Sequence, residues 1–195
     1  MIPLTQEDYL NVFRKTEALL EGHFLLTSGL HSNIYFQCAR VLQFPWYAEK
    51  LCQGLTGHFR DQAVDTVIAP AIGGIVVGQE LARQLNARSI FTERSDGNMV
   101  LRRGFQIEKG EKFLVAEDVT TTGGSVKEVV EVVRDMGGIV QSVAAIVDRS
   151  GGKKLFDVPY FSLVQLAVKN YDPESCPLCK DKLPLVKPGS RVFKK

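Results

Sequence analysis

The chain has 195 residues and a mass of 21.6 kDa, a length that favours one domain over two. Its 45% hydrophobic and 24% charged residues are typical of a globular protein and exclude a disordered, collagen-like or repetitive chain. The formal net charge of +2 gives no electrostatic footprint for nucleic acid or an anionic membrane, so an anionic ligand must be held by local geometry.

Neither a membrane span nor a signal peptide is expected from the sequence. The uncharged, apolar stretch of residues 67–79 contains Pro70 and several glycines and is shorter than the ~20 apolar residues that cross a bilayer. The N-terminal segment carries Glu7 and Asp8, whereas a signal peptide would be basic and then apolar. We therefore expect a cytoplasmic protein that binds neither membranes nor nucleic acid.

The first third of the chain predicts two helices around a pair of short strands. Thr5 and Asp8 form a capping-box pattern, and the apolar residues that follow predict a helix over residues 5–22. Two short apolar runs within residues 24–37 predict strands. A proline opens the next helical pattern, which predicts a helix over residues 45–59.

The middle of the chain alternates apolar runs with helical segments, which predicts a parallel sheet with right-handed crossovers. The runs are nearly continuous, as expected for strands buried on both faces. The polar stretch 94–110 predicts a mobile loop or hairpin, and the tail 171–195, with four prolines, is expected to be ordered only where it packs on the body or on a partner subunit. The predicted strands are 64–69, 89–92, 113–116 and 139–147, and the predicted helices are 74–86 and one ending at 136.

The strongest candidate site follows the strand at 113–116. Glu117 and Asp118 come first, then three threonines and two glycines that open a helix, where unpaired N–H groups and hydroxyls suit a phosphate. Neither a Walker A loop nor a dinucleotide fingerprint is present. The two acids would repel a polyphosphate but accept hydrogen bonds from vicinal hydroxyls, so a ribose 5-phosphate fits both halves. The alternative is a capped strand–helix turn with solvated acids.

A second strand end, residues 67–74, is a weaker candidate. Pro70 interrupts the strand, and the paired glycines Gly73 and Gly74 let the backbone approach a ligand closely before the next helix. Packing between strand and helix explains the glycines equally well. Together with the first site, this loop suggests a ligand with phosphates at both ends of a sugar.

The cysteines and histidines are assigned no site. Four cysteines are too few for a disulfide scaffold. Cys176 and Cys179 have the spacing of a metal knuckle, but a structural zinc site needs two more ligands, and the chain has no second Cys-x-x-Cys and no His-x3-His. A reduced turn in the tail is the simpler interpretation, with a redox or intersubunit contact as a further one. His23, His31 and His58 show no mutual spacing typical of metal ligands, so no metal ligand is predicted.

The segment 115–124 resembles the phosphoribosyl diphosphate (PRPP) motif of type I phosphoribosyltransferases, in which two acids precede a Thr-Gly turn. Further segments are similar to those of bacterial orotate phosphoribosyltransferases, and the likeness runs from about residue 20 to 190. These segments are 22–32, 70–74, 101–105 and 147–149, while 176–179 and 187–191 resemble one short-loop branch of that family.

The resemblance implies an α/β fold of the type I phosphoribosyltransferase kind, with a central, mostly parallel sheet flanked by helices and a small N-terminal hood. The expected organisation is a single domain over residues 1–195. Within it, about 1–60 form the N-terminal helices and hood, about 61–168 the α/β core and about 169–195 the tail.

The resemblance also implies transfer of ribose 5-phosphate from PRPP to orotate, giving orotidine 5'-monophosphate and pyrophosphate in pyrimidine (UMP) biosynthesis. It implies Mg²⁺ as cofactor and a homodimer. Asp118 and Arg94 are the expected catalytic residues. The expected substrate-binding residues are Glu117, Asp118, Val119, Thr120, Thr121, Thr122, Gly123, Gly124, Ser125 and Arg149.

Two assignments depend on particular arginines. Arg149 suits orotate because a guanidinium pairs with a carboxylate bidentately, although a salt bridge with Asp148 or another neighbour is the alternative. The long-loop branch has lysines and a histidine in its catalytic loop, whereas residues 94–103 contain neither. Arg94, with Arg102 and Arg103, is the candidate that would neutralise pyrophosphate, and a solvated surface arginine is the alternative.

Two other functions remain open from the sequence. The same fold can act on a different base, as in a purine phosphoribosyltransferase. It can also serve a PRPP-sensing regulator without catalysis, although the chain lacks the basic patch or winged-helix segment that a regulator of that kind would need.

Overall fold

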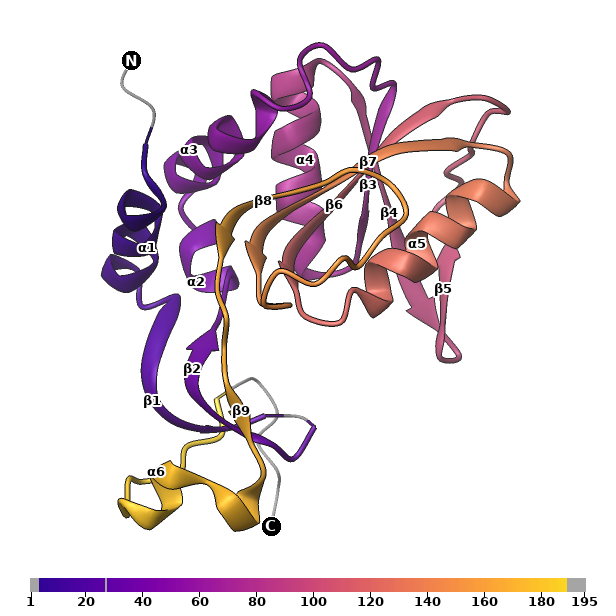
Figure 1. Cartoon of the computed structure of the whole chain (residues 1–195). Coiled ribbons are helices and arrows are strands. Elements are labelled where there is room, and N and C mark those ends of the chain that lie inside the picture. Colours follow the sequence, from indigo (N-terminus) through magenta and orange to yellow (C-terminus); the bar gives the residue numbers. More distant parts are fainter. Residues whose placement is uncertain (1–3, 27, 189–195) are drawn as a thin grey trace.

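The computed structural model describes residues 4–26 and 28–188 (Figure 1). They form a six-stranded sheet covered by helices and a separate three-stranded sheet. The helices are α1 (Gln6–Lys15), α2 (Ala39–Leu42), α3 (Pro45–Thr56), α4 (Gly73–Leu85), α5 (Gly124–Asp135) and α6 (Pro177–Lys180), with a 3-10 turn at Pro173–Ser175. The strands are β1 (Leu19–Leu25), β2 (His31–Phe36), β3 (Thr66–Pro70), β4 (Arg88–Ser95), β5 (Asn98–Leu101), β6 (Lys112–Thr120), β7 (Ile139–Asp148), β8 (Tyr160–Gln165) and β9 (Asn170–Tyr171).

The large sheet has the strand order β5-β4-β3-β6-β7-β8, and its strands are parallel except for the antiparallel pair β4–β5. After β3 the chain proceeds to β4 on one side, and after β6 it proceeds to β7 on the other. The order therefore reverses between β3 and β6, and ligands of open α/β sheets bind beyond the carboxyl ends of such strands. The predicted α/β fold is confirmed, and its crevice lies at the two strand ends that the sequence singled out.

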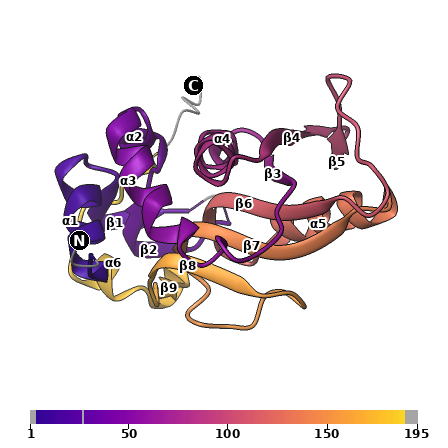
Figure 2. The same cartoon turned by 90° about the horizontal axis from the view of Figure 1, so that it is seen from above.

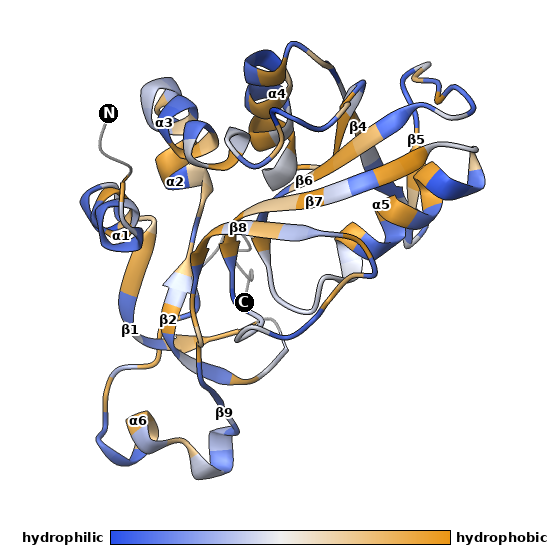
Figure 3. Cartoon of the chain, turned by 45° about the horizontal axis from the view of Figure 1, so that its top comes forward, coloured by the Kyte–Doolittle hydropathy of each residue, from blue (hydrophilic) through white to orange (hydrophobic). Residues whose placement is uncertain are grey.

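The central strands β3, β6 and β7 of the large sheet are buried on both faces, as predicted, whereas β4, β5 and β8 are partly exposed. In β3, Val67 and Ala69 belong to a core cluster with α3 and α4, whereas Ile68 between them belongs to a second cluster with α5. In β6, Leu114 and Val115 divide between the same two clusters. Figure 3 shows the strands hydrophobic over much of their length, while α4 and α5 carry both hydrophobic and hydrophilic residues. Such alternation is the pattern of a sheet between two helical layers.

The N-terminal helix is shorter than predicted. Its capping box at Thr5 is present, but α1 ends at Lys15, and the predicted region up to residue 22 contains the start of β1. Glu17 has a left-handed φ of 53°, and Leu19 pairs with Phe36 of β2. Pairing with β2 outweighs the helical spacing of the leucines, since tertiary contacts readily override local propensity.

The three-stranded sheet, which we call the hood sheet, joins the two ends of the chain. It has the order β1-β2-β9, so the tail supplies its third strand. Further along the tail, the N–H of Val186 donates to the carbonyl of His23 (2.8 Å), and the N–H of Leu25 donates to the carbonyl of Val186 (2.9 Å). Figure 2 shows the hood sheet at one end of the molecule and β5 toward the other. The tail is thus ordered where it packs on the body.

The stretch 94–110 begins with a hairpin, one of the two forms that its sequence predicts. Asp96 and Gly97 connect β4 to β5 and both have positive φ, at 49° and 85°, as a two-residue type I′ turn requires. In the described part of the chain, no helix has the length and apolar character needed to cross a membrane.

Candidate active site

The two acids lie within a strand and not after it. β6 continues to Thr120, beyond the predicted end at residue 116, because it pairs with the long β7 through Glu117↔Ala145 and Thr120↔Asp148. The Glu117 residue is 9% exposed, and Asp118 is partly buried. The alternative of solvated acids at a capped turn is therefore wrong.

Burial shifts the protonation of this pair. Desolvation, together with the neighbouring Asp118, raises the pKa of Glu117 to about 9. Desolvation also raises the pKa of Asp118, but hydrogen bonds from Glu117 and from backbone N–H groups oppose that shift; the N–H of Val119 donates to Asp118 Oδ1 at 2.8 Å. A pKa of about 9 keeps Glu117 protonated at neutral pH, beside an Asp118 whose pKa the hydrogen bonds hold down against desolvation.

The second strand end contacts the first through Gly73. A Cβ at Gly73 would lie 2.4 Å from Oδ2 of Asp118, and one at Gly74 would lie 3.1 Å from Oε1 of Glu117. The predicted close approach of the glycine pair is present, and it brings the backbone at the start of α4 against the two acids. The glycines therefore have a packing role in the site itself, since larger residues would displace the carboxylates.

The predicted phosphate loop encloses a hollow of about 250 Å³ at the start of α5. Gly123 has a positive φ of 74°, and a Cβ there would lie 2.9 Å from the Phe156 ring, so the turn needs glycine on both grounds. The N-terminus of α5 directs unpaired N–H groups toward this space, as an anion site requires. The hollow is lined by Glu117, Val119, Thr120, Thr121, Thr122, Gly123, Gly124, Ser125, Val126 and Glu128.

A second hollow of about 660 Å³ adjoins the first, because both include Val119 and Thr121 in their linings. Its volume is that of a small-molecule site, for which roughly 300–1,000 Å³ is usual. Together the two hollows bring all ten predicted substrate-binding residues to one edge of the sheet. The second is lined by Leu26, Ser28, Tyr35, Phe36, Gln37, Cys38, Ala39, Ile72, Gly73, Asp118, Val119, Thr121 and Arg149.

Arg149 is prepared to bind an anion in the second hollow. Its buried Nε has no hydrogen-bond partner, and burial lowers the pKa of the guanidinium. The neighbouring Asp148 accepts hydrogen bonds from the N–H of Ser150 (2.7 Å) and from Gln165 Nε2 (3.1 Å). The strand-end salt bridge with Asp148 is thus not formed. An unpaired buried donor costs free energy until a ligand satisfies it.

The structure does not bring Arg94 into either hollow. Its guanidinium pairs with Glu128 at 3.0 Å, and Glu128 lines the rim of the phosphate hollow. Arg103 forms a bidentate pair with Glu93, with both N–O distances 2.8 Å. Both arginines are engaged on the surface beside the site, so either must leave its partner to reach a ligand.

Two segments that resemble the family are described only in part. Residue 27, within the segment 22–32, and residues 189–191, within the segment 187–191, lie outside the described residues. A hollow of about 880 Å³ between α1, α3 and β8, lined by residues such as Trp46, contains none of the predicted site residues.

Sequence reasoning missed one cluster. His23 and His31, which were assigned no role, lie together with Cys176 and Cys179 in the hood, within 4.8 Å of one another at their ligand atoms. The signal was present but indirect: His23 precedes the region of the two predicted strands and His31 lies within it, and the chain has one Cys-x-x-Cys pair to complete a set of four.

Comparison with known proteins places the chain in a family. A family model described as a phosphoribosyl transferase domain matches residues 48–175. Orotate phosphoribosyltransferase of Caldicellulosiruptor saccharolyticus is 56% identical over 98% of this chain and 100% of its own length. That of Chlorobium phaeobacteroides (strain BS1) is 57% identical over 93% and 94%.

A solved structure gives the same result. The chain superposes on orotate phosphoribosyltransferase from Aeropyrum pernix with a TM-score of 0.67 and 27% identity, over 80% of this chain and 92% of that one. The chain therefore belongs to the phosphoribosyltransferase family and, within it, to the orotate phosphoribosyltransferases.

Proposed function

We propose that the protein transfers ribose 5-phosphate from PRPP to N1 of orotate, giving orotidine 5'-monophosphate and pyrophosphate for pyrimidine synthesis. The observation that carries the proposal is the unpartnered guanidinium nitrogen of Arg149, in a hollow shared with Asp118 and Thr121. Orotate is a base with a carboxylate, which a guanidinium binds bidentately. The names of the relatives support the same substrate.

The two hollows accommodate the two parts of the substrate pair. The 5-phosphate of PRPP occupies the threonine–glycine hollow, where N–H groups at the start of α5 and threonine hydroxyls donate to it. The ribose hydroxyls reach Asp118, and orotate lies toward Arg149. Since the hollows join at Val119 and Thr121, the ribose bridges them and its C1' faces the base.

The acid pair supplies the electrostatics of the transfer. Breaking the bond between C1' and pyrophosphate develops positive charge in the ribose, and the negative charge of Asp118 stabilises it. Glu117 stays protonated at neutral pH because of its burial, so it donates a hydrogen bond without adding a second negative charge beside the diphosphate. The remaining contribution is positioning, as the fixed strand ends hold the reactants together.

The donor atoms at this edge fit Mg²⁺, because the carboxylate of Asp118 and the hydroxyls of Thr121 and Thr122 are the hard oxygen ligands that this ion accepts. Bound mainly through substrate oxygens and water, Mg²⁺ would neutralise charge on the diphosphate. Among the described residues that line the two hollows, Cys38 is the one soft ligand, and burial keeps its thiol protonated by raising its pKa.

The direct test is an assay of purified protein with PRPP, Mg²⁺ and orotate, followed by the loss of orotate absorbance. Asp118→Asn keeps the shape and removes the charge, so it should slow turnover at least ~100-fold. Adenine and xanthine, run in parallel, should give no product. Unchanged turnover in Asp118→Asn would overturn the role of the acid pair, and transfer to a purine alone would overturn the substrate. PRPP binding without pyrophosphate release would indicate a regulator.

Arg94 is proposed to leave Glu128 and neutralise the departing pyrophosphate when the hairpin closes. Arg94→Ala should lower kcat about 10-fold and leave the melting temperature almost unchanged, because exposed ion pairs contribute ~1 kcal/mol or less. The matched variant Arg103→Ala removes the other paired arginine of the region. A loss of kcat in Arg103→Ala alone would transfer the role to Arg103.

We also propose a cytoplasmic homodimer, which the family resemblance supports. Light scattering should then give twice the chain mass of 21.6 kDa. A monomer that is fully active would contradict the proposal.

A further inference from the structure

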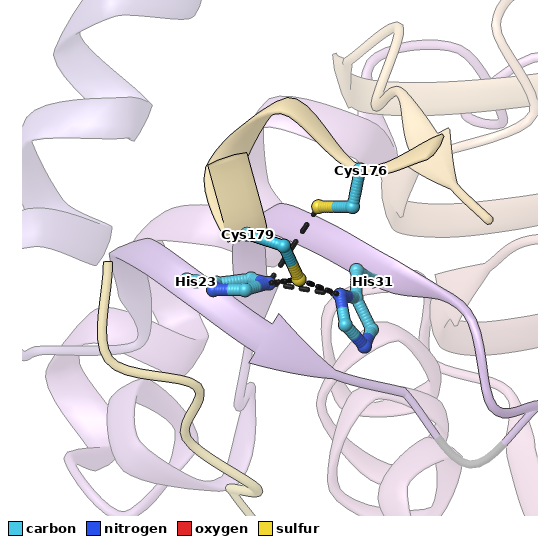
Figure 4. A group of neighbouring side chains, drawn as sticks. All are labelled: His23, His31, Cys176 and Cys179. Carbon is cyan, nitrogen blue, oxygen red and sulfur yellow. Dashed lines mark hydrogen bonds between the residues drawn. The ribbon is translucent and has the colours of Figure 1, made fainter. Parts of the chain in front are cut away.

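Four side chains that bind metals in other proteins converge in the hood (Figure 4), and none of them lines either of the two hollows. His23 comes from β1 and His31 from β2, while Cys176 precedes α6 and Cys179 lies in it. His23, His31 and Cys176 are 3%, 5% and 1% exposed, and Cys179 closes the cluster from the outside. Three separate segments of the chain thus direct nitrogen and sulfur atoms at one point.

The nitrogen–sulfur distances in the cluster are those of a tetrahedral site. Nε2 of His23 lies 2.9 Å from Nδ1 of His31, 3.6 Å from Sγ of Cys176 and 3.7 Å from Sγ of Cys179. Sγ of Cys179 lies 3.4 Å from Nδ1 of His31. Zinc bonds of about 2.3 Å to sulfur and about 2.0 Å to nitrogen, arranged tetrahedrally, give a nitrogen–sulfur separation of about 3.5 Å.

Hydrogen bonding within the cluster does not account for this arrangement. Nδ1 of His23 lies 2.9 Å from the carbonyl of Leu183, to which it must donate, so Nε2 carries the lone pair of a neutral imidazole. Three atoms face that one lone pair, and only one of them can give it a proton. A cation at the centre satisfies all four ligand atoms together. The hydrogen bond to Leu183 is also the outer contact that usually orients a metal-bound histidine.

We propose that the hood binds one Zn²⁺ through Nε2 of His23, Nδ1 of His31 and the sulfurs of Cys176 and Cys179. Two thiolates and two imidazoles are soft or borderline ligands, which favour zinc over magnesium or calcium. Four protein ligands leave no open position for water or substrate, so the site is structural. It is a different site, with different ligands, from the oxygen-lined edge where Mg²⁺ is expected.

The metal joins the tail to the β1–β2 hairpin. β9 has only two residues, so the hood sheet is small for independent stability. The connection between β1 and β2 carries Leu26 and Ser28, which line the second hollow. Loss of the metal should therefore loosen one wall of the orotate site and leave the phosphate hollow intact.

Metal analysis of the full chain, purified without added metal or chelator, tests the site. We expect about one zinc per chain, and after exchange for Co²⁺ the visible bands of a tetrahedral cobalt site with thiolate ligands. Cys176→Ser and Cys179→Ser should lose these bands. Cys52→Ala, which removes a buried cysteine of α3 outside the cluster, should keep them. Removal of zinc from the wild type should lower the melting temperature by at least ~5 °C.

The measurements on the wild-type protein test the proposal even if a serine variant fails to fold. A wild-type protein without zinc that also gives no cobalt–thiolate bands overturns the proposal. So does a disulfide between Cys176 and Cys179, seen as a loss of two hydrogens in the intact mass. If a folded Cys176→Ser variant still binds the metal, the metal lies at another place, and the proposed site is also overturned.

Discussion

The carboxyl edge of the large sheet gathers polar groups that are neighbours in the sequence, whereas the hood gathers polar groups that are distant in the sequence. At the edge, Glu117, Asp118 and the threonine–glycine turn follow one another in the chain, and the glycine pair Gly73–Gly74 approaches the acids from another strand end. In the hood, His23 and Cys176 are 153 residues apart and meet only in the folded chain.

The difference teaches that the two regions depend on different forces. The edge uses hard oxygen atoms and backbone N–H groups, held rigidly by strands buried on both faces, so a small displacement affects chemistry directly. The hood has a small sheet, and its nitrogen and sulfur atoms hold segments together. A change at the edge should therefore reduce activity by displacing reacting groups, whereas a change in the hood should reduce stability by separating its segments.

Among the variants that test this difference, Gly73→Ala should have the largest effect on activity. Its new Cβ would lie 2.4 Å from Oδ2 of Asp118, which forces the carboxylate or the start of α4 to move. A displacement of that size should lower kcat/KM for PRPP about 100-fold or more. Gly57→Ala is the matched control, because Gly57 has helical dihedrals and no atom within 4 Å of an added Cβ. Equal activity in the two variants would contradict the rigid edge.

Arg149→Gln should have an intermediate effect that is confined to one substrate. The variant cannot bind a carboxylate bidentately, so KM for orotate should rise about 10- to 100-fold, as loss of a hydrogen bond to a charged group implies. KM for PRPP should change less than ~3-fold. Arg134→Gln, which removes an exposed pair with Asp157, should change neither. An equal rise in both KM values would mean that Arg149 shapes the whole pocket.

Glu117→Gln should have the smallest effect on catalysis of the three variants, and its main effect should be on the pH dependence of stability. The pKa of Glu117 is raised from 4.5 to about 9, so between these values the folded chain holds a proton that the unfolded chain releases. The stabilising effect of that proton is complete below pH 4.5 and is lost as pH rises toward 9. From pH 5 to 9 the wild-type melting temperature should fall about 10 °C more than that of Glu117→Gln, since about four pH units of linked protonation correspond to roughly 5 kcal/mol. Parallel curves would mean that Glu117 titrates normally.

The sequence identifies the edge well because its signals are local. A buried strand, two acids and a Thr-Gly turn are contiguous, and the alternation of strands with helices places them at the sheet's switch point. The extension of β6 to Thr120 is not visible, since it depends on the length of β7. The ion pair of Arg94 with Glu128 is also not visible, because it joins a hairpin to a helix.

The hood is harder to predict because its contacts are distant in the chain. Leu19 and Leu20 keep helical spacing yet lie in β1, where pairing with β2 decides their conformation. His23 and His31 are not neighbours at helical or knuckle spacing, and the register of β1 and β2, with its irregularity between Glu21 and Phe24, brings them together. No local sequence pattern predicts that the tail packs against this hairpin.

The pairing of β9 with β2 and of Val186 with β1 has a consequence for synthesis. During translation the strands of the large sheet leave the ribosome before the tail does, and domains fold as their elements become available. The hood sheet needs both its first strand and β9, so it can close only after residue 171 has emerged. A nascent chain would therefore assemble the phosphate hollow first and complete the wall of the second hollow last.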